Sequence, residues 1–199
     1  MRYPDNVDAM SDMELLEFLR RPISVDEYNQ MAEVGILARD ERVELLDGDV
    51  IVVPPHGPPH FSTVLRMGQR LTLGLATRAD VSVQLPIIVS ERSEPEPDIA
   101  ILAKREDCYA SGLPHPPDVF AIVEVADSSL PVDAGKKLKI YAEAGIPEYW
   151  IVDVPRGAVI VHRDPVGSLY DSIRTAYRGA SVSFAAFPGE TFTVDELIG

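Results

Sequence analysis

The feature that most constrains this fold is an apolar run with one carboxylate inside it. Residues 119–126 read VFAIVEVA, and Glu124 is the one charged side chain among them. Such a run, rich in β-branched side chains, is typical of a strand covered on both faces. An unpaired carboxylate is costly to bury in such a strand. The chain therefore has to provide a partner for the charge of Glu124.

The N-terminal quarter of the chain carries strong local signals. Residues 12–19 have a helical pattern, and a second helix is predicted from Ser24, which Glu27 answers three residues later in a capping box, to a stop at Gly35. Asp47 and Gly48 predict a tight hairpin between strands at residues 42–46 and 49–53. We expect residues 1–21 to form a helical extension and residues 22–199 to form a single domain.

The remaining pattern predicts a mixed β-sheet with helices packed on it. The segment PPHGPPH indicates a loop, and a helix of about four turns is expected from His60. The unit of strand 119–126, helix 132–144 and strand 148–153 is typical of a right-handed βαβ crossover. The other expected elements are strands at 81–89, 98–102 and 157–162, polar loops at 90–97 and 103–117, and a β-rich tail to residue 192.

Composition excludes several classes of protein. The 199 residues include 18 Lys and Arg against 32 Asp and Glu, a net charge of −14, which argues against a broad basic surface for nucleic acid. The single cysteine, Cys108, excludes a disulfide framework and a thiolate zinc site. An acidic N-terminus and the lack of a long apolar run predict no membrane association and a cytoplasmic location.

Three acids occupy unusual positions near apolar runs. Glu44 lies inside a predicted strand, Asp98 opens the run IAIL, and Glu124 lies inside the run described above. The strands at 98–102 and 119–126 follow each other in the chain, so their acids can meet at one level of a sheet. Close like charges raise each other's pKa, and a divalent cation with oxygen ligands, such as Mg²⁺, removes the conflict.

Each acid also has an ordinary structural explanation. An Asp at a strand start is more often a turn or cap residue, and a Glu in a strand usually points to solvent. Three lysines, at positions 136, 137 and 139, follow Glu124 on the next predicted helix. They form either a solvated helix face or a source of positive charge for the acids. Spacing alone does not indicate which of the three lysines would contact the acids.

Several motifs occur together in one order along the chain. They are VELLDGDVIVVPP followed by His60, then PDIAIL, then PPDVFAIVEVADSS, then DAGKKLKIYAEAGIPEYWIVD. In this combination the chain resembles the Uma2 family over nearly its whole length. That family is assigned to the PD-(D/E)XK superfamily, so the resemblance implies a restriction-endonuclease-like α/β (α+β) fold: a mixed β-sheet flanked by helices, with an N-terminal β-hairpin extension.

The resemblance also implies catalytic residues. Asp98 matches the aspartate of the proline-aspartate pair, and Glu124 matches the second acid, both as metal ligands. The general motif places a lysine two residues after the second acid, where this chain has Ala126. Lys137, four residues before Tyr141, matches a lysine that has moved onto the following helix in this family.

Three further residues are assigned to the site as ligand or support. The resemblance implies Glu44 as an additional metal ligand and His60 as a supporting residue, although a helix-start histidine is equally often hydrogen-bonded only locally. Gln84, predicted in the middle of the strand at 81–89, is the other supporting candidate.

The implied activity is Mg²⁺- or Mn²⁺-dependent hydrolysis of phosphodiester bonds in nucleic acid, with DNA as the expected substrate. Because lysine and arginine are scarce, we expect compensation from oligomerisation such as a homodimer, from a partner, or from a basic patch around residues 104–105 and 136–139. Two alternatives stay open. One is a catalytically silent nuclease fold that acts as a binding or regulatory module, and the other is a purely structural α+β domain.

Overall fold

A six-stranded mixed sheet forms the centre of the computed structural model, which describes residues 11, 19–38, 40–127 and 129–199. In chain order its strands are β3 (Ala79–Val83), β4 (Ile99–Ala103), β5 (Val119–Ala126), β6 (Glu148–Asp153), β7 (Ala158–Val166) and β8 (Leu169–Tyr177). They lie side by side in that same order. Every neighbouring pair is antiparallel except β5 and β6, which are parallel. The predicted mixed sheet is confirmed.

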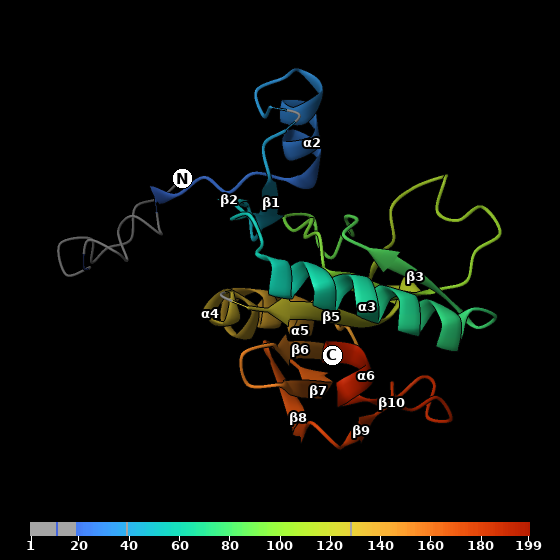
Figure 1. Cartoon of the computed structure of the whole chain (residues 1–199). Coiled ribbons are helices and arrows are strands. Elements are labelled where there is room, and N and C mark those ends of the chain that lie inside the picture. Colours follow the sequence, from blue (N-terminus) through green and yellow to red (C-terminus); the bar gives the residue numbers. More distant parts are fainter. Residues whose placement is uncertain (1–10, 12–18, 39, 128) are drawn as a thin grey trace.

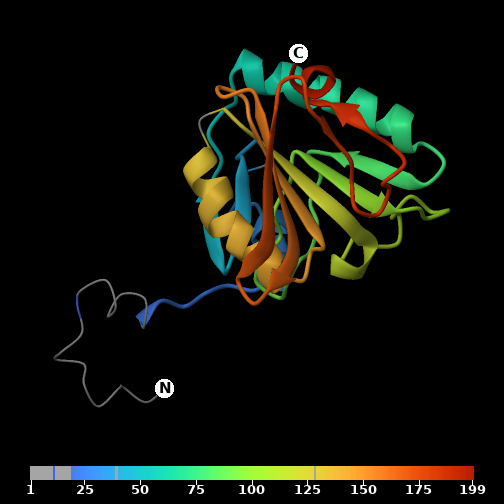
Figure 2. The ribbon, with the colours of Figure 1, turned by 90° about the horizontal axis from the view of Figure 1, so that it is seen from below.

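Helices cover both faces of this sheet (Figure 2). One face carries α3 (Pro58–Leu75) and the short α6 (Val194–Ile198). The other face carries a continuous helical segment made of α4 (Leu130–Val132), the π-helical turn Asp133–Lys137 and α5 (Leu138–Glu143). In β5, Val123 and Val125 belong to the core on the α3 side, whereas Ile122 and Ala126 belong to the core on the α5 side. This strand is buried on both faces, as its sequence predicts.

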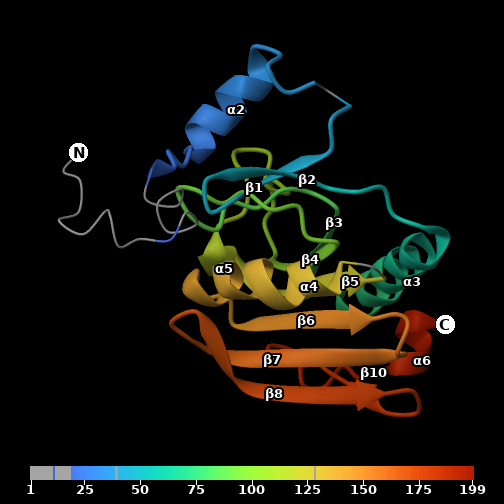
Figure 3. The same cartoon turned by 90° about the vertical axis from the view of Figure 1, so that its left-hand side faces the viewer.

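The predicted N-terminal elements are present. Helix α2 (Val25–Glu33) begins with the capping box of Ser24 and Glu27, in which each side chain accepts from the other's backbone N–H. Strands β1 (Val43–Leu46) and β2 (Asp49–Val52) form the hairpin, and Asp47 and Gly48 both have positive φ, at 54° and 78°. A tight turn of mirror-image geometry requires such angles. These elements lie at the end of the large sheet away from β8 (Figures 1 and 3), and Leu46 of β1 belongs to the core on the α5 side.

Two predicted boundaries were wrong near the site. The strand expected at 81–89 ends at Val83, because Gln84 adopts a left-handed conformation with φ of 50° and cannot continue the pleat. Gln84 therefore follows β3 and does not lie mid-strand. Helix α3 begins at Pro58, two residues before His60, since proline at the first helical position gives up no intrahelical hydrogen bond.

Other differences concern the second half of the chain. The helix predicted from residue 132 begins at Leu130 and contains the π-helical turn. The β-rich tail contains β8, β9 (Ser181–Val182) and β10 (Phe192–Thr193), but it ends in α6, which was not predicted. Thr193 caps this five-residue helix together with Glu196. A short 3₁₀ turn, Pro116–Asp118, precedes β5.

Two predictions about the N-terminal part of the chain are not tested by the structure. The helix expected at residues 12–19 lies, except for its last residue, outside the described residues, and the division of the chain at residue 21 stays a prediction. Among the helices of the described segments, none combines the length and the apolarity that crossing a membrane requires.

Candidate active site

The two acids predicted as metal ligands lie next to each other at one end of the sheet. Strands β4 and β5 pair antiparallel with Ile99 opposite Val123, so Asp98 and Glu124 occupy neighbouring positions just beyond that pair. The backbone N–H of Asp98 donates to Glu124 Oε2 over 3.4 Å, and the N–H of Val125 donates to Asp98 Oδ2 over 2.9 Å. The sheet register therefore brings both carboxylates to one place.

Lys137 reaches the same place from the helical segment after β5. Its Nζ lies 3.0 Å from Glu124 Oε1 and 3.1 Å from Glu44 Oε2, and all three side chains are buried. The hydroxyl of Tyr141, four residues further along, donates to the same Oε1 over 2.8 Å. The positive partner that Glu124 requires is thus a lysine, held between two carboxylates.

One of the three lysines enters the site. The π-helical turn spans Asp133–Lys137, and Lys137 lies four residues before the buried Tyr141, on the same face of the helical segment. Lys136 instead pairs with Asp49 of the hairpin over 2.7 Å, and Lys139 faces solvent near Glu143. Lys137 alone among the three is buried, at 7% exposed.

Glu44 comes from the N-terminal hairpin. All four residues of β1 are buried, and Glu94 N–H donates to Leu45 O over 2.8 Å, which ties this strand to the loop before β4. With a neighbour fixed in this way, Glu44 points inward at 4% exposure and not toward solvent. The hairpin therefore supplies one wall of the site and an acid within it.

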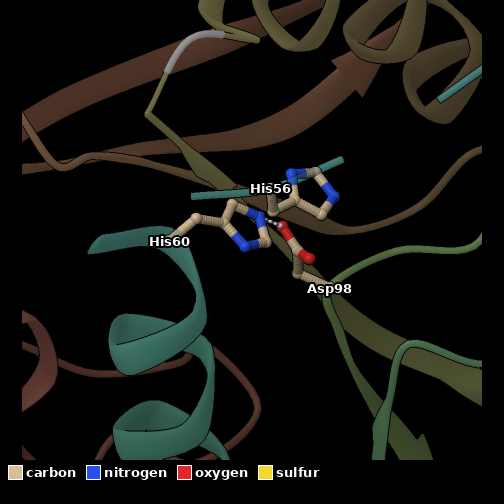
Figure 4. A group of neighbouring side chains, drawn as sticks. All are labelled: His56, His60 and Asp98. Atoms are coloured by element: carbon tan, nitrogen blue, oxygen red, sulfur yellow. Dashed lines mark hydrogen bonds and ion pairs between the residues drawn. The ribbon is translucent and has the colours of Figure 1, made fainter. Parts of the chain in front are cut away.

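The two supporting candidates both contact Asp98. His60, in the first turn of α3, places its Nε2 3.0 Å from Asp98 Oδ2, and Gln84 Nε2 donates to Asp98 Oδ1 over 3.2 Å. The ring of His56 stacks on that of His60 with centroids 3.7 Å apart and planes 4° apart. Figure 4 shows both rings beside the Asp98 carboxylate.

Burial and charge act on these groups in different directions. Burial raises the pKa of Glu124 to about 8, although the Lys137 ammonium opposes this rise. Burial by itself would lower the pKa of Lys137, but Glu124, Glu44 and Asp133 raise it well above its usual value. Burial also acts to raise the pKa of Asp98, yet the hydrogen bonds from His60, the Val125 N–H and Gln84 bring it below its usual value. Asp98 is therefore the anionic member of the pair, and Glu124 is the one that readily takes a proton.

One cleft, with a volume of about 370 Å³, is lined by Asp98, Glu124, Glu44, Lys137 and Gln84. Burial also raises the pKa of Glu44, Asp133 and Glu96 in its walls. Within the described lining, the lysine and arginine side chains are Lys137 and Arg42. The cleft thus gathers more carboxyl groups than bases, which favours a cationic occupant. Its acidic lining residues are Asp40, Glu41, Glu44, Glu96, Asp98, Glu124 and Asp133.

Sequence reasoning missed three residues of this cleft. Asp133 lies four positions before Lys137, so the helical spacing was a usable signal for it. Its carboxylate accepts from Ser129 Oγ, and it is buried. Glu96 and His56 lie in loops rich in proline, where no periodicity indicates which way a side chain points.

The expected basic patch is not one surface. Lys104 pairs with Asp80 over 3.0 Å, and Arg105 pairs with Asp107 over 2.9 Å, both at the far end of β4. Asp98, at the opposite end of that strand, marks the cleft. Because acidic side chains pair with Lys104 and Arg105, these two residues offer little attraction for phosphates.

Comparison with known proteins agrees with this architecture. The crystal structure described as "a putative nuclease belonging to DUF820", from Anabaena variabilis, superposes with a TM-score of 0.68 at 16% sequence identity, covering 89% of this chain and 98% of that one. At this identity the likeness shows a shared fold. A search among curated proteins finds no match. The profile of the Uma2 family, described as "Putative restriction endonuclease", matches residues 25–195. This chain therefore belongs to the Uma2 family.

Proposed function

We propose that the chain hydrolyses phosphodiester bonds in nucleic acid, with DNA as its substrate and with Mg²⁺ or Mn²⁺ as its cofactor. The observation that carries this proposal is the convergence of Asp98, Glu124 and Lys137 in one cleft. Family membership supports the nuclease class. The choice of DNA, the cation and the residue roles are proposals.

The residues of the cleft fit a hard divalent cation. Asp98 Oδ1 accepts one hydrogen bond, from Gln84, and Glu124 Oε2 accepts one long bond, from the N–H of Asp98, among the described residues. Each carboxylate oxygen has about two lone pairs, so both retain room for a further ligand bond. Carboxylate oxygens are what Mg²⁺ binds best. Asp98 and Glu124 would hold the cation, with Glu44 as a further ligand, and the bound cation would supply an acidified water and stabilise charge on the phosphate.

The chain's own groups would position the reactants. Lys137 has three N–H donors and uses two of them on Glu124 and Glu44. The third would orient a water or a phosphate oxygen. The hydroxyl of Tyr141 fixes the rotamer of Glu124, while Gln84 and the N–H of Val125 fix Asp98. Such rigid placement is a large part of what an active site contributes to rate.

Substrate affinity should be modest. Lys104 and Arg105, which were expected to contact phosphates, are paired with acidic side chains, and the net charge of the chain is −14. Few phosphate contacts give weak binding with a shallow dependence on salt. A second copy of the chain, forming a homodimer, remains our proposal for the missing contacts.

One observation favours the alternative of a catalytically silent binding module. Lys137 already forms ion pairs with both Glu124 and Glu44, so one of their two charges is compensated without a cation. A protein that had lost its chemistry would keep this closed arrangement for stability alone. The two functions differ in whether added Mn²⁺ produces cleavage.

The test is a cleavage assay on supercoiled plasmid, single-stranded DNA and RNA with Mg²⁺ or Mn²⁺. Wild type is compared with Glu124→Gln and Lys137→Met, and the matched controls are Glu143→Gln and Lys139→Met, an exposed pair on the same helical segment. We expect cleavage that both site variants abolish and both controls retain. Cleavage that survives in both site variants, or no cleavage of any substrate by wild type, would reject the proposal.

A further inference from the structure

Beside the acidic cleft lies a second group of metal-ligating side chains, of different chemistry. His56, His60 and Asp98 each offer one ligand atom, and these atoms all lie within 4.8 Å of one another. They come from the loop before α3, from its first turn and from the start of β4, as Figure 4 shows. Two imidazoles and one carboxylate favour borderline transition metals over Mg²⁺, which prefers an all-oxygen shell.

From this geometry we infer that His56, His60 and Asp98 form a binding site for a divalent transition metal of the Zn²⁺ and Co²⁺ type. Asp98 would then serve both this histidine site and the acidic cleft. The histidine site is argued from its own ligands and does not require that the chain cleave nucleic acid. Its link to the cleft through Asp98 rests on the proposed function.

The anchoring of the three groups suits such a site. Asp98 is held by the N–H of Val125 and by Gln84, and contacts of this kind orient a metal ligand and tune its basicity. His60 is buried at 2% exposure, with its Nε2 already directed at Asp98. Two of the three ligands are therefore in place before any metal arrives.

His56 is the exposed member of the group. Among the described residues its ring stacks on that of His60, and its side chain makes no hydrogen bond there. A tetrahedral metal with bonds of about 2.1 Å holds its ligand atoms about 3.4 Å apart. The three ligand atoms lie within 4.8 Å of one another, so a small adjustment of the side chains brings them to that spacing. At His56 the loop before α3 has no strand or helix that would resist this adjustment.

The local charge also favours a cation. The N-terminus of α3 carries a partial positive charge, which opposes a metal there. The full charge of the Asp98 carboxylate, which lies 3.0 Å from His60 Nε2, outweighs it. Glu96 and Arg42 both line the same hollow as the two histidines, and their opposite charges offset each other there.

The experiment measures Co²⁺ and Zn²⁺ binding to the metal-stripped full chain by calorimetry and by the visible absorption of Co²⁺. The variants are His56→Ala and, as a matched control, His115→Ala, which removes an exposed loop histidine far along the chain. We expect His56→Ala to weaken Co²⁺ binding by about 100-fold, since losing even an outer partner of a ligand costs about 10- to 100-fold. His115→Ala should bind as wild type does. Mg²⁺ affinity should be unchanged in both variants.

Nuclear magnetic resonance gives an independent readout. Sub-stoichiometric Co²⁺ should broaden the ring resonances of His56 and His60 before those of His115 and His162. Equal Co²⁺ affinity in wild type and His56→Ala, or equal broadening of all four rings, would overturn the inference. Failure of the cleavage assay with Co²⁺ binding still dependent on His56 would reject the nuclease but keep this site.

Discussion

Replacing Lys137 with methionine tests how strongly the buried acids depend on its ammonium. The substitution keeps the length and apolar stem of the side chain but removes the group that lies 3.0 Å from Glu124 and 3.1 Å from Glu44. Removing one partner of a buried ion pair costs about 3–5 kcal/mol, because an uncompensated charge is left behind. We expect a loss near the lower end, about 3 kcal/mol at about pH 9.5, since Glu124 of the variant can keep its proton. For a chain of this size that lowers the Tm by about 6–12 °C.

The loss should depend on pH in a defined direction. The pKa of Glu124 is raised from 4.5 to about 8 in the folded protein, and removing the ammonium that opposes this rise moves it further up. A carboxyl group with a raised folded pKa contributes stability that is fully present below its unfolded pKa and is lost as the pH rises through the folded pKa. Glu124 is protonated in both folded proteins near pH 5, so the destabilisation caused by Lys137→Met is smallest there. It grows as the pH rises above about 8, where Glu124 ionises in wild type but not in the variant.

The assay is urea unfolding at about pH 5 and about pH 9.5, followed by the fluorescence of Trp150, the single tryptophan of the chain. Lys139→Met is the matched control, because its ion pair with Glu143 is exposed and 3.8 Å long, and such pairs contribute about 0.5 kcal/mol. An equal loss at both pH values, or a loss at the higher pH no larger than that of Lys139→Met, would refute the reasoning.

Three further outcomes are expected. The apparent affinity for Mg²⁺, measured by calorimetry, should rise by about tenfold per pH unit up to about pH 8 and level off above it. The reason is that binding must displace the proton of Glu124. An affinity that does not change with pH would contradict this prediction. Glu148→Gln should destabilise the protein by about 2–3 kcal/mol without affecting cleavage. The buried Glu148 carboxylate accepts hydrogen bonds from Trp150 and Arg163, and it lies away from the cleft. Urea unfolding measures the stability, and the cleavage assay measures the activity. Gly48→Ala should destabilise the hairpin by more than about 1 kcal/mol and weaken metal binding, because φ is +78° at this position and an added Cβ would lie 2.3 Å from the Cβ of Pro22. A variant with the wild-type melting temperature and the wild-type metal affinity by calorimetry would contradict this prediction.

Much of the fold could be predicted from local patterns. The turn at Asp47 and Gly48 and the capping box of Ser24 and Glu27 are read from two to four adjacent residues, and the structure contains both. Both predictions succeed because the physical cause lies within the same short segment: residues that accept positive φ in the turn, and side chains that accept from free N–H groups in the capping box. The resemblance to the Uma2 family, and the fold it implies, are confirmed.

Other features could not be predicted because their causes lie far away in the chain. Gln84 ends β3 in a left-handed conformation that its residue type does not favour, and its side chain is held by Asp98 fourteen positions later. Helix α6 is too short to show a period, and it is stabilised by burial against α3.

The sequence by itself determined that β5 is buried on both faces and that Glu124 inside it needs a positive partner, because apolar periodicity and the cost of a buried charge are local properties. Only the tertiary structure decided that this partner is Lys137 and not one of its two neighbours. That choice depends on how the helical segment packs on the sheet and on an acid, Glu44, that lies 93 positions from the lysine it contacts. No local pattern encodes the distance between such segments, since packing of the hairpin and the helical segment against the sheet sets it.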